Sequence, residues 1–125
     1  MKAKIYYHHT DCGGVVYYAT YLEFLERART EFLAEKGIDV KGLMEEGNFF
    51  VVSEQELDYK APVRYGDVIE VETVIKEVSA VRIELGHKIK NSTGSIAVEA
   101  RTVLAFIDKN FKPKAIPHNL SDKLI

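Results

Sequence analysis

The stretch Thr20–Gly37, with the sequence TYLEFLERARTEFLAEKG, determines how we interpret the rest of the chain. Its apolar side chains recur at steps of three and four residues, which is typical of one face of a helix. These side chains are Tyr21, Phe24, Leu25, Ala28 and Phe32. Thr20 and Glu23 have the spacing of a capping box, and Gly37 is a common helix stop. We therefore expect a helix from about Tyr21 to Lys36 whose apolar face packs on a sheet.

Outside this helix the pattern favours strands. β-Branched and aromatic residues predict a short strand over Lys4–His8. Four longer strand-like segments follow the helix, at about 49–60, 67–78, 81–91 and 95–108. Alternation is clearest in the third of them, where five residues share the more apolar side: Val81, Ile83, Leu85, His87 and Ile89. Short joins between long strands favour antiparallel pairing.

The fold class that follows is α+β, with one long helix packed on a five-stranded antiparallel sheet. A second, short helix is expected over Val40–Glu46 with Asp39 as its cap, and the tail from Asn110 is expected to be irregular. We interpret residues 1–125 as a single domain. Long strands leave sheet edges that a second copy of the chain can pair with, so we expect a homo-oligomer.

Composition argues against several classes of protein. The chain has 17 Lys and Arg residues against 19 Asp and Glu residues, and this balance disfavours nucleic-acid binding. No segment approaches the roughly 20 apolar residues of a membrane span, and the first residues lack the apolar run of a signal peptide. A single cysteine cannot form an internal disulfide, which fits a reducing compartment. We expect a cytoplasmic protein without a nucleic-acid partner or an integral membrane segment.

Reactive residues concentrate in the segment His8–Tyr18. His8, His9, Asp11 and Cys12 are all metal-ligand types, but adjacent histidines on a strand point to opposite sides, and we expect no metal site. Cys12 has His9 nearby in sequence, which does not establish the spatial pair that a cysteine nucleophile needs. A lone cysteine is more often a small buried residue.

Asp11 is the third candidate, because it precedes Gly13, Gly14 and the start of the long helix. The N–H groups that a helix start leaves unpaired can hold a carbonyl oxygen as it becomes an oxyanion. Asp11 would then attack the carbonyl carbon or activate a water molecule, and the glycines would let a substrate approach the backbone. A simpler interpretation is that Asp11 only orders the turn through side-chain hydrogen bonds to the backbone.

Three stretches carry a resemblance to a known family. The pattern Tyr7-x-x-x-Asp11-x-Gly13-Gly14-Val15-Val16-Tyr17-Tyr18-Ala19-x-Tyr21, followed by Phe24–Arg29, resembles the opening of the 4-hydroxybenzoyl-CoA thioesterase family. It is most similar to the branch of bacterial acyl-CoA thioesterases associated with the Tol–Pal system. Tyr59–Asp67 is similar to the second recurring stretch of that branch, and the ending Lys112–Pro117 also fits.

The resemblance implies a hotdog fold, in which an antiparallel sheet wraps a long helix and two copies join their sheets edge to edge. It implies hydrolysis of an acyl-CoA thioester by a dimer or a dimer of dimers, with the acyl pocket at the subunit interface. Coenzyme A is then part of the substrate, and no metal or redox cofactor is implied. The rival hypothesis is a hotdog module that binds acyl-CoA or acyl-carrier protein without hydrolysing it.

The resemblance also suggests roles for single residues. Asp11 stands at the position of the catalytic aspartate, the backbone N–H of Tyr18 at that of the group that polarises the thioester carbonyl, and Tyr7 at that of a tyrosine near the aspartate. Close relatives of the Tol–Pal branch have histidine where this chain has Tyr18, so an acid–base role of that imidazole is lost here. For substrate binding we consider Gly13, Gly14, Val16 and Tyr17.

Tyrosines crowd the proposed site, which suggests a short to medium aliphatic or an aromatic acyl group. Basic residues are candidates for contacts to the phosphates of coenzyme A. These are Lys60 and Arg64, with weaker candidates in Arg82, Lys88 and Lys90. We interpret His87 as a hydrogen-bonded core histidine, and the helix acids Glu23, Glu26 and Glu31 as capping or surface residues.

Overall fold

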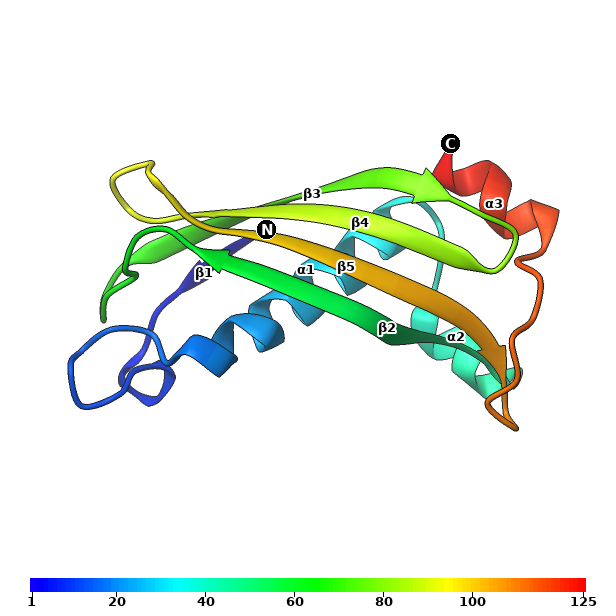
Figure 1. Ribbon diagram of the computed structural model, residues 1–125, viewed down its shortest axis with the longest axis horizontal. Helices are drawn as coiled ribbons and strands as arrows, with labels where there is room; N and C mark the ends of the chain where they lie inside the picture. The colour runs from blue at the N-terminus through cyan, green and yellow to red at the C-terminus, as the bar shows by residue number, and fades with distance from the viewer.

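The computed structural model describes residues 1–125 and consists of one curled sheet with helices on its concave side and at one end (Figure 1). The strands are β1 (Lys2–Lys4), β2 (Asn48–Tyr59), β3 (Val68–Val78), β4 (Arg82–Lys90) and β5 (Ile96–Asp108). The α-helices are α1 (Tyr21–Glu35), α2 (Val40–Glu45) and α3 (His118–Leu124). Two 3₁₀ turns, Tyr7–His9 and Tyr18–Thr20, precede α1. The four long strands lie within one residue of the predicted limits.

All strand pairs are antiparallel, and the strands lie in the order β1-β3-β4-β5-β2. β1 covers three residues of β3 at one edge, whereas β2 forms the other edge over its whole length of 12 residues. A bulge at Ser53 shifts the register of β2 against β5. One long sheet edge is therefore free in the isolated chain.

The helix α1 begins at the predicted residue, Tyr21, and ends within one residue of the prediction, but its start is not capped as predicted. Gly37 has φ +81°, the left-handed conformation that commonly ends a helix. At the other end, Thr20 has helical dihedral angles and its side chain makes no capping hydrogen bond, so the predicted capping box with Glu23 is wrong. The preceding 3₁₀ turn runs directly into α1, which leaves Thr20 inside a helical turn rather than in front of it.

The space between α1 and the sheet holds two apolar clusters. One surrounds the first half of α1 and includes Phe24 and Leu25; the other involves the second half of α1 and includes Leu33 and Phe106. Between them the helix-facing side of the sheet carries four polar side chains. These are Gln55, Thr73, His87 and Thr102. The core is thus divided by a polar layer.

Three smaller predictions are wrong. β1 covers Lys2–Lys4 rather than Lys4–His8, because the N–H of Tyr6 donates to Nδ1 of His9 and closes a turn instead of extending a strand. The tail is not irregular throughout: α3 follows Pro117 and buries Leu120 and Leu124, a short apolar pattern that gives little signal. The side chain of Asp39 makes no hydrogen bond to cap α2.

No helix is both long enough and apolar enough to cross a lipid bilayer.

Candidate active site

The start of α1 and the end of β2 lie at the same end of the molecule (Figure 1). A cleft of about 480 Å³ opens between residues of these two regions. The loop before α1 forms one wall, and the end of β2 with the residues after it forms the other. Most of the lining side chains are apolar or aromatic. The lining residues are Asp11, Val15, Val16, Tyr17, Tyr18, Tyr21, Tyr59, Lys60, Ala61 and Pro62. The cleft brings together five residues of the predicted site: Asp11, Val16, Tyr17, Tyr18 and Lys60.

Asp11 is the one carboxylate that lines this cleft. Its Oδ1 accepts a hydrogen bond of 2.8 Å from the N–H of Gly13, and its backbone carbonyl accepts one of 3.1 Å from the N–H of Gly14. Gly14 has φ +74°, which a residue with a side chain adopts only under strain. The carboxylate therefore orders the turn through Oδ1, while Oδ2 accepts no hydrogen bond from the protein.

The backbone around Tyr18 is held at two carbonyl groups. The carbonyl of Tyr17 belongs to the same peptide unit as the N–H of Tyr18, and it accepts a 2.9 Å hydrogen bond from the N–H of Thr20. The carbonyl of Tyr18 accepts a 2.9 Å hydrogen bond from the hydroxyl of Tyr59. The N–H of Tyr18, at the first position of the 3₁₀ turn, has no acceptor in the surrounding loops. It remains available to a ligand beside the positive end of α1.

Four tyrosines give the cleft aromatic walls with hydroxyl groups. The rings of Tyr17 and Tyr18 lie 4.8 Å apart, and those of Tyr21 and Tyr59 lie 5.6 Å apart. A hydrogen bond with Tyr18 raises the pKa of Tyr17, and burial raises the pKa values of Tyr21 and Tyr59. These three phenols consequently stay protonated at neutral pH and act as neutral groups.

The remaining predicted residues lie around the cleft rather than in its wall. Gly13 and Gly14 form the turn that holds Asp11. Tyr7 is 73% exposed, and its ring stacks on Tyr65 at 5.8 Å rather than facing the cleft.

The two leading basic candidates are placed differently. The side chain of Arg64 is exposed, and its backbone N–H donates to Oδ2 of Asp67. Lys60 lies in the wall and pairs with Asp58 at 3.2 Å, which raises the pKa of the lysine.

The histidines and the cysteine near the cleft are placed differently from what the sequence suggested. His8 and His9 lie in a 3₁₀ turn with their rings 4.0 Å apart, so the argument that they point to opposite sides of a strand is wrong. Nδ1 of His9 accepts a hydrogen bond from the N–H of Tyr6, and burial together with His8 lowers the pKa of His9. Nowhere in residues 1–125 do three or more His, Cys, Asp or Glu residues gather as metal ligands would. Cys12 is exposed rather than buried as a lone cysteine usually is.

His87 is a core histidine, as predicted. Its side chain is 3% exposed, and its Nδ1 lies 3.0 Å from Oγ1 of Thr73. Burial, with a smaller contribution from Arg29, lowers the pKa of His87 to about 4. The helix acids Glu23, Glu26 and Glu31 are exposed and line no part of the cleft.

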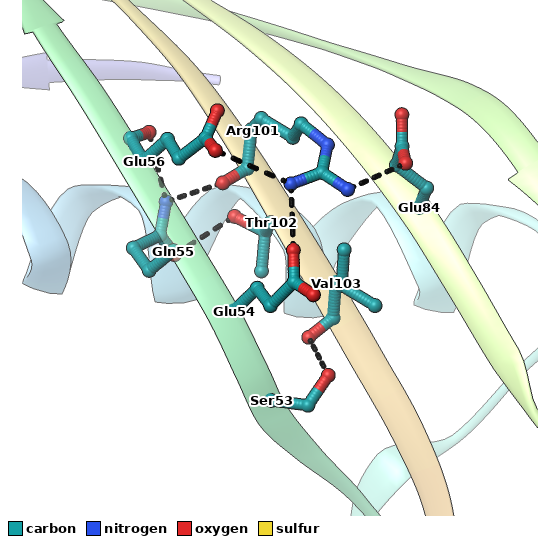
Figure 2. A network of polar contacts seen from close by, with 8 residues as sticks. All are labelled: Ser53, Glu54, Gln55, Glu56, Glu84, Arg101, Thr102 and Val103. Carbon is teal, nitrogen blue, oxygen red and sulfur yellow. Dashed lines mark hydrogen bonds and ion pairs between the residues drawn. The ribbon is translucent and has the colours of Figure 1, made fainter.

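The outer face of the sheet is charged and lies away from the cleft. Figure 2 shows Arg101 of β5 between carboxylates of two neighbouring strands. Its guanidinium lies 2.8 Å from Glu54, 3.6 Å from Glu56 and 3.0 Å from Glu84. The three weaker candidates for coenzyme A contacts, Arg82, Lys88 and Lys90, line hollows outside the cleft.

Sequence reasoning missed Tyr59 as a site residue, although it begins the second stretch on which the family resemblance rests. Its hydroxyl reaches a residue 41 positions away, and no local pattern encodes that contact. One signal was present. Leu57 and Tyr59 lie two positions apart on the same side of a strand, and Leu57 packs against the core beside α1.

Proteins that are similar to this chain in sequence and in fold include thioesterases. The model of the thioesterase-like superfamily matches residues 7–124. The acyl-CoA thioester hydrolase YbgC of Escherichia coli is 36% identical over 118 residues, which cover 94% of this chain and 88% of the relative. The acyl-CoA thioesterase YbgC of Haemophilus influenzae is 37% identical over 116 residues, covering 91% and 85% of the two chains.

Solved structures share the fold of this chain. A hypothetical protein of Thermus thermophilus has a TM-score of 0.93 at 30% identity, with 99% of this chain and 95% of that chain covered. The DHNA-CoA thioesterase of Staphylococcus aureus has a TM-score of 0.92 at 25% identity, with 98% and 83% covered. The expected fold, a curled antiparallel sheet around one long helix, is confirmed. This chain belongs to the thioesterase-like superfamily and has its hotdog fold.

Proposed function

We propose that this protein hydrolyses acyl-CoA thioesters to the free acid and coenzyme A, with Asp11 and the N–H of Tyr18 as its catalytic groups. One observation carries the proposal. Asp11, with a free carboxylate oxygen, and Tyr18, with an unpaired N–H at a helix start, are both among the residues that line the same cleft. Thioester hydrolysis needs such a pair, because one group supplies or activates the nucleophile while the other stabilises the oxyanion.

The reaction follows from this placement. The thioester carbonyl oxygen accepts a hydrogen bond from the N–H of Tyr18, beside the positive end of α1. In the general-base route, Asp11 takes a proton from water, and the resulting hydroxide attacks the carbonyl carbon. The tetrahedral intermediate collapses, the C–S bond breaks, and the thiolate of coenzyme A receives the proton. In the nucleophilic route, a carboxylate oxygen of Asp11 attacks the carbon, the C–S bond breaks and the thiolate of coenzyme A leaves. Water then hydrolyses the mixed anhydride to the product acid and the free Asp11 carboxylate, and the thiolate takes up the released proton. The reaction as proposed uses no metal or redox cofactor.

Isotope placement separates the two routes. In a single turnover in ¹⁸O-labelled water, the general-base route places the label in the product acid at once. The nucleophilic route gives a first product acid with an unlabelled oxygen from Asp11, since water attacks the enzyme carboxyl carbon. An unlabelled first product identifies an enzyme carboxylate as the nucleophile, whereas a labelled first product identifies direct attack by water; the substitution Asp11→Asn then tests which residue takes the proton.

We propose short to medium aliphatic or aromatic acyl groups as substrates. The tyrosine walls supply apolar surface and neutral hydroxyl donors, which suit an aromatic or a small acyl group better than a long chain. The relative from Staphylococcus aureus is a DHNA-CoA thioesterase, which is consistent with this class. A preference for palmitoyl-CoA of about a hundredfold in kcat/KM would contradict the proposal.

We also propose a homo-oligomer in which β2 pairs with a second copy, either as a dimer or as a dimer of dimers. The helix-facing side of this edge strand carries a row of incompletely covered side chains. These are Phe50, Val52, Gln55, Leu57 and Tyr59. Val52 lies opposite the buried Leu104 and is nevertheless 44% exposed, because no element of the same chain covers it. A second sheet edge would bury this row and satisfy the free backbone groups of β2.

For the compartment we propose the cytoplasm. Cys12 has an exposed thiol that forms no disulfide, and such a thiol is compatible with a reducing environment.

The main alternative is a module that binds acyl-CoA without hydrolysing it. Release of free thiol from a small panel of acyl-CoA compounds, followed with a thiol reagent, decides between the two. We expect release with at least one aromatic or short-chain substrate. Tight binding of the same compounds without thiol release would establish the binding module instead.

A further inference from the structure

We propose that Tyr59 is a positioning residue. Its hydroxyl fixes the peptide groups at Tyr18, the first residue of the 3₁₀ turn Tyr18–Thr20. This inference rests on the proposed function, because it assigns Tyr59 to the N–H of Tyr18 that polarises the thioester. Tyr59 is the last residue of β2, whereas Tyr18 begins the 3₁₀ turn before α1. The hydroxyl of Tyr59 donates a hydrogen bond of 2.9 Å to the carbonyl of Tyr18.

The ring of Tyr59 is held from two directions. On one side it contacts Tyr21, whose own side chain is buried in the core, with 5.6 Å between the ring centres. On the other side it extends β2, whose pairing with β5 continues through Tyr59 and Val98. The aromatic body is thus fixed to the sheet and to α1, and the hydroxyl is placed at a defined point.

That point lies next to the proposed oxyanion donor. The carbonyl of Tyr18 belongs to the peptide unit that follows this residue, and the N–H belongs to the unit before it. The preceding unit is already tied by the bond from Thr20 to the carbonyl of Tyr17. With the hydroxyl of Tyr59 on the following unit, both peptide planes that flank Tyr18 are restrained. The N–H is therefore aimed before a substrate arrives.

Such preorganisation affects the transition state more than substrate binding. A hydrogen-bond donor fixed in the right direction stabilises the transition state, in which negative charge develops on the oxygen. The ground-state thioester carbonyl accepts only a weak hydrogen bond, so it is stabilised less. Tyr59 is not expected to touch the reacting atoms. Its loss should therefore lower kcat and leave KM nearly unchanged.

The substitution Tyr59→Phe tests this directly, because it removes one hydroxyl and keeps the ring that packs on Tyr21. Complete loss of an oxyanion donor costs about 10²–10³ in kcat, so loss of its aim should cost a part of that, about tenfold. We expect KM to stay within about twofold. Tyr65→Phe is the matched control, since it removes an exposed hydroxyl outside the cleft. Melting temperatures of both variants establish that they are folded.

An infrared measurement gives a readout that a merely structural role would not move. A ¹³C-carbonyl acyl-CoA is bound to Asp11→Asn, which we expect to turn over slowly, and its carbonyl stretch is recorded with and without Tyr59→Phe. We expect a lower frequency than in solution with Tyr59 present, and a broader band closer to the solution value with phenylalanine. Tyr65→Phe should leave the band unchanged.

The outcomes separate this inference from the proposed function. If the unmodified protein releases thiol and folded Tyr59→Phe has the same kcat and the same carbonyl frequency, the positioning role is wrong and the thioesterase proposal stands. If Tyr59→Phe raises KM alone, Tyr59 is a binding residue and the inference is overturned. If the unmodified protein releases no thiol, both proposals fall together.

Discussion

Oγ1 of Thr73 lies 3.0 Å from Nδ1 of His87 across the pair formed by β3 and β4. Nε2, the other ring nitrogen of His87, is buried and has no hydrogen-bond partner. The positive charge of Arg29 on α1 adds to the effect of burial and lowers the pKa of His87 further. A proton added to His87 would therefore create an imidazolium in a buried place that already faces a cation and offers no carboxylate.

This arrangement predicts a loss of stability in acid. The pKa of His87 is about 4 in the folded protein, against about 6.5 in an unfolded chain. Between these pH values the unfolded state binds more protons, so the free energy of unfolding falls as the pH is lowered from about 6.5 to about 4. The fall attributable to His87 is at most about 3 kcal/mol.

Urea unfolding of the wild type and of His87→Gln at several pH values measures this contribution. Glutamine keeps a hydrogen-bonding group for Thr73 but does not titrate. Because carboxylates and His9 also titrate, the quantity to follow is the difference between the two proteins. That difference should shift in favour of the variant as the pH falls through the window. A difference independent of pH would contradict the prediction.

Asp11→Asn separates the chemical role of the carboxylate from its role in the turn. Asparagine retains an oxygen that can accept the 2.8 Å bond from Gly13, so the melting temperature should change little. The charge and the ability to take a proton are lost, and kcat should fall by about 10²–10⁴ if the residue is a general base. Thiol release gives the rate. Asp122→Asn, an exposed change on α3, is the control. Wild-type activity in a folded Asp11→Asn protein would return the residue to its structural role.

Two glycines should respond in opposite ways to alanine. Gly14 has φ +74° with nothing near its missing Cβ, so Gly14→Ala adds backbone strain of about 1–2 kcal/mol. It also disturbs the turn of Asp11, and we expect kcat to fall about tenfold.

Gly86 lies inside β4, where an added Cβ would meet the flexible end of Lys76, which can move into solvent. Gly86→Ala should be neutral or stabilising by about 0.5–1 kcal/mol, since glycine weakens strands. Denaturant unfolding and thiol release on both variants check the pair. Strong destabilisation by Gly86→Ala would show that Lys76 cannot yield.

Val52→Asp tests the proposed pairing of β2. The substitution places a charge on the helix-facing side of the free edge, in the row that a second copy would cover. Light scattering should give a multiple of 14.2 kDa for the wild type and a shift toward 14.2 kDa for the variant. Val74→Asp changes an exposed valine on the outer face of β3, which is 55% exposed against 44% for Val52, and should keep at least the dimer mass. An active wild type at 14.2 kDa at micromolar concentration would contradict the proposal.

The regular elements were predictable because their signals are local. The four long strands alternate over nine or more residues, and α1 repeats its apolar residues over four turns, so their limits came out nearly right. The start of the chain was not predictable in the same way. There Tyr6 and His9 form a side-chain hydrogen bond that competes with strand pairing, and composition alone favours the strand.

The residues of the candidate site also differ in how far the sequence could predict them: those close together in sequence were predicted, whereas Tyr59, which the fold brings in, was not. Asp11, Val16, Tyr17 and Tyr18 lie close together in sequence, and a short loop brings them to one cleft. Tyr59 reaches this cleft only because β2 returns along α1 to its starting end. The ring of Tyr7 turns toward Tyr65 because a stacked partner lies there, and the sequence does not encode that direction.

The division of the core into two apolar clusters has a consequence for how such a protein can change over generations. The cluster around Phe24 lies beneath the cleft, whereas the cluster around Leu33 lies at the opposite end of α1, with the polar layer of His87 and Thr102 between them. Substitutions that reshape the first cluster alter the floor of the cleft without repacking the second. Distant sites of this kind contribute nearly additively to stability. The far cluster can therefore keep the fold stable while substitutions in the first cluster change the shape of the cleft.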